Sequence, residues 1–217
     1  MIITISRESG AGGSAVARGV AKALGWRVVD NELIDEIAAR SGLTPAEVVE
    51  RGERAPGFLE RLLRLLTRAA PEILSPPAED PESAEARLVK ITETVVAEMA
   101  LEGRVVMVGR AAPAVLKGDR DGLHVKIVAP LADRIAAVSA RLGGSVEAAT
   151  TAVARSDANR ARYHWQYYHR DWNDAAHYHL VLNTAALGLD GAVATIVGRA
   201  KTLWPAETRE RRVAGDA

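Results

Sequence analysis

Short β-branched runs alternate along this chain with longer stretches that place apolar residues at helical spacing. The runs predict strands, and the longer stretches predict helices. The predicted strands cover residues 2–5, 26–29, 105–108, 123–128 and 177–182, and the predicted helices cover residues 15–24, 31–40, 84–101, 131–142, 145–162 and 189–203. Strands that alternate with helices are typical of a parallel sheet with helices on both faces. We therefore predict an α/β fold in three layers with a five-stranded parallel sheet.

The segment 41–87 departs from this alternation. It has a less regular helical pattern with leucines between Phe58 and Leu74, and it continues into a run with three prolines and several acidic residues at 75–82, which predicts an exposed loop. We predict that 1–40 and 88–217 form the core, with a lid at about 145–175, and that 41–87 is a helical insertion on the acceptor side of the site. A plain helical hairpin packed on the sheet stays open as the alternative.

The first strand leads into a glycine-rich turn, Gly10-Ala11-Gly12-Gly13-Ser14, and then directly into a helix. Such a turn suits a phosphate chain, because backbone N–H groups and the positive end of the helix dipole meet there. Aligned on the phosphate-loop pattern GxxxxGK[ST], Arg7 stands at the first glycine and Gly13 at the lysine. Ser14 keeps the hydroxyl that would hold Mg²⁺, and Arg7 is our candidate for the missing cation. A tight turn that only needs glycine's backbone freedom is the alternative.

Polar residues also follow other predicted strands. Asp30 follows the second strand, Arg110 the third, and Asn183 the last. Because the carboxyl ends of parallel strands lie at one edge of a sheet, these side chains predict a single phosphate-handling site. A helix N-cap is the alternative role for Asp30, and a surface salt bridge for Arg110. His124 and Lys126 alternate with apolar neighbours, which predicts edge or solvent-facing positions.

The helix predicted from residue 145 carries a compact set of charges and leads into an aromatic, histidine-rich stretch at 163–172. Stacking of single-stranded nucleic acid is disfavoured, because the net charge is zero and no second basic, aromatic patch is found. A metal site is disfavoured because the histidines lack compact ligand spacing. The third interpretation is a mobile lid whose arginines reach the transferred phosphate. His177 and His179 are predicted to lie on the last strand, facing solvent or a satisfied partner.

Composition limits the class of protein. The chain has 217 residues, 28 basic and 28 acidic side chains and no cysteine. The charge balance gives no reason to expect nucleic acid or a membrane surface as a partner. Disulfides and thiolate metal sites are excluded, and no apolar run approaches the roughly 20 residues of a membrane span. We expect a cytoplasmic protein with small-molecule substrates, and we leave the oligomeric state open.

Several blocks of the sequence together resemble the cytidylate-kinase-like family, a branch of the nucleoside monophosphate kinases. They are ITISRESGAGGSAVARGVAKALGWRVVDNELI, VVMVGRAAPAVL, LHVKIVAPLADRI, the set Asp157, Arg160 and Tyr163, and DWNDAAHYHLVLNT. The resemblance spans nearly the whole chain except about 50–85, and the loop of this family also lacks the lysine. It implies a P-loop kinase fold with core, acceptor-binding and lid parts, MgATP as the donor and a cytidine monophosphate-like acceptor.

The resemblance also implies roles for individual residues. Those implied to bind ATP are Ser9, Gly10, Ala11, Gly12, Gly13, Ser14 and Asn183, with Ser14 holding Mg²⁺. Arg7 would replace the missing lysine. The residues implied to act on the acceptor are Asp30, Arg110 and Asp157, with Asp30 orienting the acceptor or a metal-bound water. The lid arginines implied to neutralise transferred charge are Arg155, Arg160 and Arg162, with Asp157 holding one of them in place. Two alternatives stay open: a kinase of the same fold with another small acceptor, and a nucleotide-binding regulatory protein without phosphoryl transfer.

Overall fold

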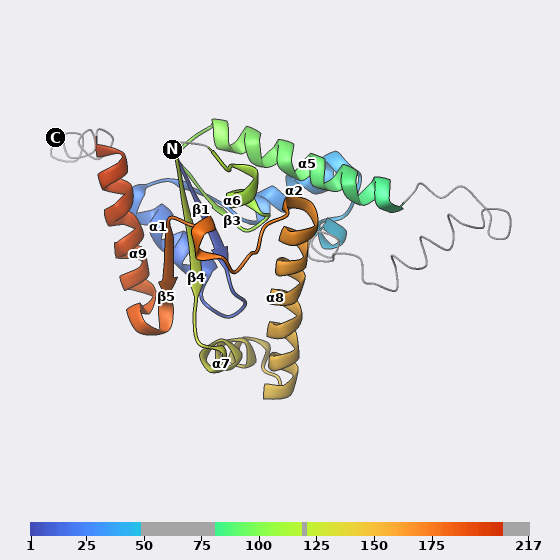
Figure 1. The fold of residues 1–217 in the computed structure, drawn as a ribbon. Coiled ribbons are helices and arrows are strands. Elements are labelled where there is room, and N and C mark those ends of the chain that lie inside the picture. Colours follow the sequence, from blue (N-terminus) through green and yellow to red (C-terminus); the bar gives the residue numbers. More distant parts are fainter. Residues whose placement is uncertain (49–80, 119–120, 206–217) are drawn as a thin grey trace.

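The core of the protein is a five-stranded parallel sheet. The structure, a computed structural model, describes residues 1–48, 81–118 and 121–205. The strands are β1 (Ile2–Arg7), β2 (Arg27–Val29), β3 (Val105–Val108), β4 (Gly122–Val128) and β5 (Leu180–Asn183), in the spatial order β2-β3-β1-β4-β5 (Figure 1). All neighbouring strands pair in parallel. The predicted sheet is confirmed.

Helices cover both faces of this sheet. Helices α1 (Gly13–Leu24) and α9 (Thr184–Leu203) pack together on one face, and α2 (Asn31–Ser41) and α5 (Pro81–Leu101) pack together on the other. Because successive strand residues point to opposite faces, Ile3 packs with α1 and α9 whereas Ile2 packs with α2 and α5. Burying each such side chain contributes roughly 1.5–3 kcal/mol. The predicted three-layer architecture is confirmed.

A pair of helices, α7 (Leu131–Leu142) and α8 (Val146–Tyr168), packs together beside the sheet through Val138, Ala149 and Val153. The prediction that α8 ends near residue 162 is wrong. The helix continues to Tyr168 and ends where His169 adopts a left-handed conformation, with φ of 50°. The reason is tertiary packing, because buried Tyr163 packs on Ala111 and Ala114 at the short helix α6 (Ala112–Val115). Part of the aromatic stretch at 163–172 therefore belongs to the buried core.

The prediction for His124 and Lys126 is also wrong. Strand β4 lies between β1 and β5, and both side chains are buried. His124 Nδ1 is hydrogen-bonded to the Thr4 hydroxyl at 2.8 Å, and Lys126 Nζ donates to the Trp172 carbonyl. The alternation of polar and apolar residues had indicated an edge strand or solvent-facing side chains. The segment after α8 covers these side chains instead.

The last strand is shorter than predicted. His177 ends a 3-10 helix, η1 (Ala175–His177), and β5 begins only at Leu180. The exposed His179 precedes β5, and its Nδ1 accepts a hydrogen bond of 2.9 Å from the backbone N–H of His124. His179 therefore has a hydrogen-bond partner, which is one of the two environments predicted for it.

Other boundaries differ by a few residues. Helix α5 begins at Pro81, and α9 begins at Thr184 with a break at Gly188, just before the helix predicted from residue 189. Of the predicted insertion 41–87, residue 41 ends α2, residues 45–48 are helical and residues 81–87 belong to α5, whereas residues 49–80 lie outside the described residues. The division into core, insertion and lid stays a prediction.

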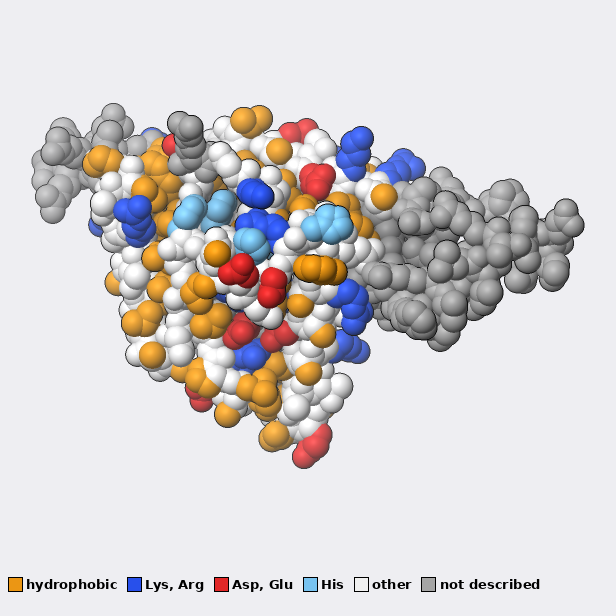
Figure 2. All heavy atoms as spheres, in the orientation of Figure 1, with side chains coloured by type: hydrophobic (Ala, Val, Ile, Leu, Met, Phe, Trp, Pro, Cys, Tyr) orange, Lys and Arg blue, Asp and Glu red, His pale blue; other side chains and the backbone are white. Residues whose placement is uncertain are grey.

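The surface is mixed in charge. On the face seen in Figure 2, basic and acidic side chains lie in small interspersed groups, in keeping with the equal numbers of the two in the sequence. In the described part of the chain, no helix is both long enough and apolar enough to cross a bilayer.

Candidate active site

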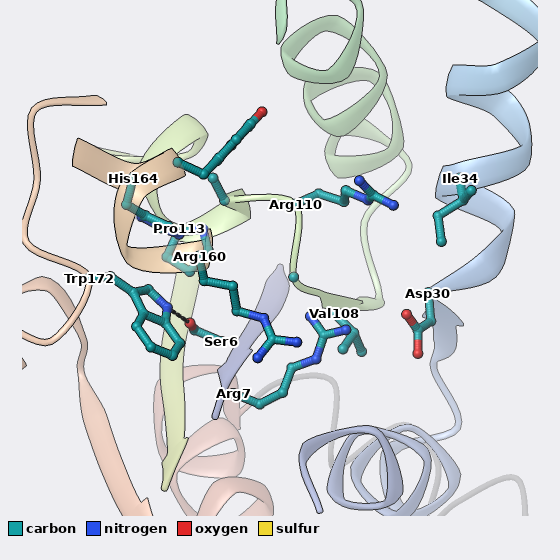
Figure 3. Close-up of a pocket in the computed structure, with 13 residues that line it drawn as sticks. Ser6, Arg7, Asp30, Ile34, Val108, Arg110, Pro113, Arg160, His164 and Trp172 are labelled. Atoms are coloured by element: carbon teal, nitrogen blue, oxygen red, sulfur yellow. Dashed lines mark hydrogen bonds between the residues drawn. The ribbon is translucent and has the colours of Figure 1, made fainter. Parts of the chain in front are cut away.

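A pocket of about 290 Å³ opens at the carboxyl ends of β1, β2 and β3 (Figure 3). Four of the predicted site residues line it together, namely Arg7, Asp30, Arg110 and Arg160. Strands deliver the first three, since Arg7 ends β1, Asp30 follows β2 and Arg110 follows β3. Arg160 comes from α8. Of the three residues that the sequence analysis placed at one edge of the sheet, Asp30 and Arg110 line this pocket, whereas Asn183 does not.

The glycine loop between β1 and α1 has the backbone of an anion-binding turn. Gly10 and Gly12 have positive φ, 86° and 80°, and Gly12 is the N-cap of α1. A Cβ added at Gly10 would overlap the backbone carbonyl of Arg134 on α7. Glycine is therefore required there for space as well as for conformation. The N-terminus of α1 adds the positive end of its dipole at the same place.

Ser14 and Asp30 form a hydrogen-bonded pair of oxygen groups beside this loop. The Ser14 hydroxyl donates to Asp30 Oδ2 at 3.3 Å, which joins the first turn of α1 to the end of β2. Mg²⁺ prefers hard oxygen ligands and usually keeps part of its water shell. A hydroxyl and a carboxylate at this separation fit such an ion.

The Arg7 side chain occupies the space that a lysine at position 13 would need. A Cβ added at Gly13 would lie 2.5 Å from Arg7 Cβ and 2.9 Å from its Cγ. Further out, the Arg7 guanidinium passes over Gly109, where an added Cβ would overlap Nη1. Figure 3 shows this guanidinium near that of Arg160, inside the pocket. The two departures from the loop pattern therefore depend on each other sterically, because Arg7 fits only beside a glycine.

The turn after β3 has an unusual backbone. Gly109, Arg110 and Ala111 have φ of 78°, 51° and 51° in succession. For residues with a Cβ this region costs roughly 1–2 kcal/mol each, and such strain is concentrated at functional sites. The Gly109 N–H donates to the Ile5 carbonyl at 3.0 Å, and Arg110 Nη1 donates to the Val48 carbonyl at 3.3 Å. These bonds hold Arg110 at the pocket.

Replacing Gly109 with alanine tests the path of Arg7. We expect Gly109→Ala to lower kcat/KM for ATP by about 10²-fold, because misplacing a binding group by about 1 Å costs that much. Gly103→Ala is the matched control, since Gly103 also has positive φ (66°) but has open space where the methyl group would lie. Both variants should lose similar free energy of unfolding. Equal kinetics in the two variants would contradict the role of Gly109.

Asp157 joins α8 to the glycine loop. Its carboxylate accepts from the Ser9 backbone N–H at 2.9 Å, from Arg134 at 2.5 Å and from Arg160 at 3.1 Å. It therefore holds Arg160, as the sequence analysis expected of one lid arginine. Asp157 is not among the residues that line the pocket, so its predicted contact with the acceptor stays a prediction.

Sequence reasoning missed Arg134. This buried arginine donates to the carbonyls of Ala129 and Ser9, pairs with Asp157 and lies 3.3 Å from Glu8. The sequence feature that could have indicated a role for Arg134 is its place in the first turn of a helix that starts at the carboxyl end of a strand. Arg134 thereby fixes the glycine loop against α7 and α8.

Other predicted residues lie away from the pocket lining. Arg155 and Arg162 are exposed on α8, and Asn183 is the exposed N-cap of α9, where its side chain accepts from the Ala185 N–H at 3.0 Å. Their predicted roles in charge neutralisation and ATP binding stay predictions. Next to Asn183, the Thr184 hydroxyl donates to the Ala11 carbonyl at 2.9 Å, a second contact that supports the loop.

The wall of the pocket beyond Arg160 is formed by Ser6, His164 and Trp172. The Trp172 indole N–H donates to Ser6 Oγ at 2.9 Å (Figure 3). Burial lowers the pKa of His164 to about 4, and the charges of Arg170, Lys126 and His177 act in the same direction. His164 is therefore a neutral side chain in the folded protein near pH 7.

His164 makes stability depend on pH. Its folded pKa lies below the ordinary value of 6.5, so the unfolded chain binds a proton first as pH falls. Between pH 7 and about pH 4.5 this group should remove about 2–3 kcal/mol from the free energy of unfolding. Urea unfolding at the two pH values measures the loss, and His164→Gln should reduce it by that amount. An identical pH dependence in both proteins would contradict burial of a neutral imidazole.

A parallel sheet in this strand order, a glycine loop that opens α1 and arginines at the carboxyl edge define the P-loop kinase class. The chain belongs to the cytidylate kinase-like family, whose model matches residues 2–186. The cytidylate kinase of Natronomonas pharaonis is 30% identical over 90% of this chain and 87% of its own. That of Methanothrix thermoacetophila is 28% identical over 85% and 88%. Family membership supports a nucleotide kinase, and ATP is the donor it implies.

Solved structures support the fold. An uncharacterized protein from Eubacterium ventriosum superposes with a TM-score of 0.66 at 20% identity, over 93% of this chain and 98% of its own. Shikimate kinase from Bacteroides thetaiotaomicron gives 0.50 at 16% identity, over 94% and 97%. At these identities the likeness concerns architecture alone, and it agrees with the P-loop kinase fold.

Proposed function

We propose that this protein transfers the γ-phosphoryl group of MgATP to a nucleoside monophosphate with a preference for cytidine monophosphate. The observation that carries the proposal is the convergence of Arg7, Arg110 and Arg160 on one pocket beside the glycine loop. The described lining contains a single carboxylate, Asp30. This excess of positive charge suits two phosphate groups brought together better than it suits a neutral alcohol.

On the donor side, the N–H groups of Gly10, Gly12, Gly13 and Ser14, at the loop and the N-terminus of α1, bind the β-phosphate. The Ala11 N–H donates to the Glu8 carbonyl at 3.2 Å and is not available to phosphate. Arg7 takes the place of the loop lysine at the β- and γ-phosphates. Ser14 and Asp30 would hold Mg²⁺, and the bound ion would supply neutralisation of charge on the donor oxygens. The Ser9 N–H is not available to phosphate while it donates to Asp157.

On the acceptor side, Arg110 binds the monophosphate and holds one of its oxygens in line with the γ-phosphorus. The reaction forms a P–O bond from that oxygen to the γ-phosphorus and breaks the bond to the β,γ-bridging oxygen, giving ADP and a nucleoside diphosphate. Arg160 neutralises charge on the transferred group, and Asp157 orients Arg160. A phosphate acceptor is already anionic at pH 7, so the step needs positioning and charge neutralisation without a dedicated general base.

Radiolabelled ATP and a panel of acceptors test the proposal. The panel includes the cytidine, uridine, adenosine and guanosine monophosphates, together with shikimate and gluconate as hydroxyl acceptors. We expect labelled nucleoside diphosphates, with cytidine monophosphate giving the highest kcat/KM. Transfer to a hydroxyl acceptor alone would overturn the acceptor class. Binding of MgATP without transfer to any acceptor would favour the regulatory alternative.

A further inference from the structure

Behind the Trp172 wall of the pocket lies a buried lysine that the mechanism does not use. Lys126 is 3% exposed and sits on β4 beside Ser6 of β1, its partner in the strand register. Its Nζ donates to the Trp172 carbonyl at 2.7 Å and to Asn173 Oδ1 at 2.9 Å. The same atom lies 4.1 Å from the centre of the Trp172 ring, within cation–π range.

These contacts fix both ends of Trp172. The backbone carbonyl is held by Lys126 and by the Tyr178 hydroxyl, at 2.9 Å for the second bond. The indole N–H is held by Ser6, directly before Arg7, and the ring face is held by the Lys126 ammonium. The indole N–H, the ring face and the backbone carbonyl of Trp172 are thus all engaged at once. The pocket wall that it forms is therefore set from the β4 side of the sheet.

Stability alone does not account for a lysine at this position. Burial lowers the pKa of Lys126, because desolvation disfavours the ammonium, and the more distant carboxylates of Glu8, Asp171 and Asp157 act against that shift. A buried charge carries a desolvation cost that an apolar side chain of similar volume avoids. Methionine at 126 would leave the Trp172 carbonyl with its Tyr178 partner and the exposed Asn173 amide with solvent.

We infer that Lys126 is a positioning residue that holds Trp172 as the wall of the acceptor pocket and thereby sets acceptor affinity. The part of this inference that concerns the acceptor rests on the proposed function. The fixing of Trp172 rests on the contacts alone. A group that acts through the wall should affect binding of the acceptor more than binding of the donor at the loop. It should also affect Trp172 in the absence of any ligand.

Lys126→Met tests the inference, with Lys201→Met on the exposed side of α9 as the matched control. In the kinetic arm we expect KM for cytidine monophosphate to rise by on the order of tenfold, a loss of about 1.4 kcal/mol of binding. KM for ATP and kcat should stay within about twofold, and the urea midpoint should be unchanged or higher. The control should match the wild type in all four quantities.

A ligand-free arm separates this inference from the proposed function. The protein is labelled with 5-fluorotryptophan, and the ¹⁹F resonance of Trp172 is assigned by its loss in Trp172→Phe. We expect Lys126→Met to shift and broaden this resonance, and Lys201→Met to leave it unchanged. An unchanged resonance overturns the inference even in an active enzyme, as does a shifted resonance with an unchanged acceptor KM. If the wild type phosphorylates no monophosphate, the proposed function fails, and an altered resonance still supports the fixing of Trp172.

Discussion

Arg7→Met should lower kcat/KM for MgATP by roughly 10²–10³-fold, the usual effect of removing one preorganised donor to developing charge. The physical reason is that the Arg7 side chain fills the space beside Gly13 and carries the loop's cation into the pocket. The methionine keeps most of the stem and removes the charge, so the free energy of unfolding should change little. Steady-state kinetics with the acceptor at saturation measures the effect.

Arg18→Met is the control for this variant, because Arg18 is an exposed arginine on α1. Arg18→Met should leave the kinetics unchanged. Arg7→Lys should recover part of the loss, since a lysine keeps the charge but not the two-pronged geometry of a guanidinium. Wild-type kinetics in Arg7→Met would show that another group supplies the cation.

Arg160→Met should lower kcat by on the order of 10³-fold while KM for ATP changes little. An arginine that contacts only the transferred group acts in the transition state, so its loss appears in kcat. Arg160 is suited to this role because it lines the pocket and Asp157 orients it at 3.1 Å. Single-turnover measurements at saturating substrates separate the chemical step from product release.

Arg141→Met, which removes an exposed arginine near the end of α7, is the control for this second variant. It should leave kcat unchanged. A rise in KM for the acceptor without a fall in kcat would instead make Arg160 an acceptor-binding residue. An unchanged kcat and KM in Arg160→Met would reject both roles.

The centre of the sheet was predictable from the sequence because β1 and β3 are buried on both faces and therefore read as short apolar runs. The positions of Arg7, Asp30 and Arg110 followed from the same fact, since each stands at the carboxyl end of a strand and parallel strands end at one edge. The apolar runs and the polar residues that follow them are local features of the sequence. The rule that parallel strands end at one edge of the sheet then brings those polar residues together.

The features that sequence reasoning missed depend on contacts between distant parts of the chain. Lys126 was expected near solvent because β4 alternates polar and apolar residues, and only the fold shows that Trp172 covers it. Arg134 carries no local signal of its partners, since Asp157 lies 23 residues further along the chain. The length of α8 was missed because the packing of Tyr163 on Ala111, and not helix propensity, extends it.

Titration calorimetry with MgATP tests the central claim most directly, namely that a loop with arginine at 7 and glycine at 13 still binds a triphosphate. We expect the wild-type protein to bind one MgATP per chain, and Arg7→Met to bind it at least tenfold more weakly, a loss of about 1.4 kcal/mol. Absence of binding by the wild-type protein at millimolar MgATP would contradict the claim, and the assignment as a nucleotide-dependent phosphotransferase would fail with it.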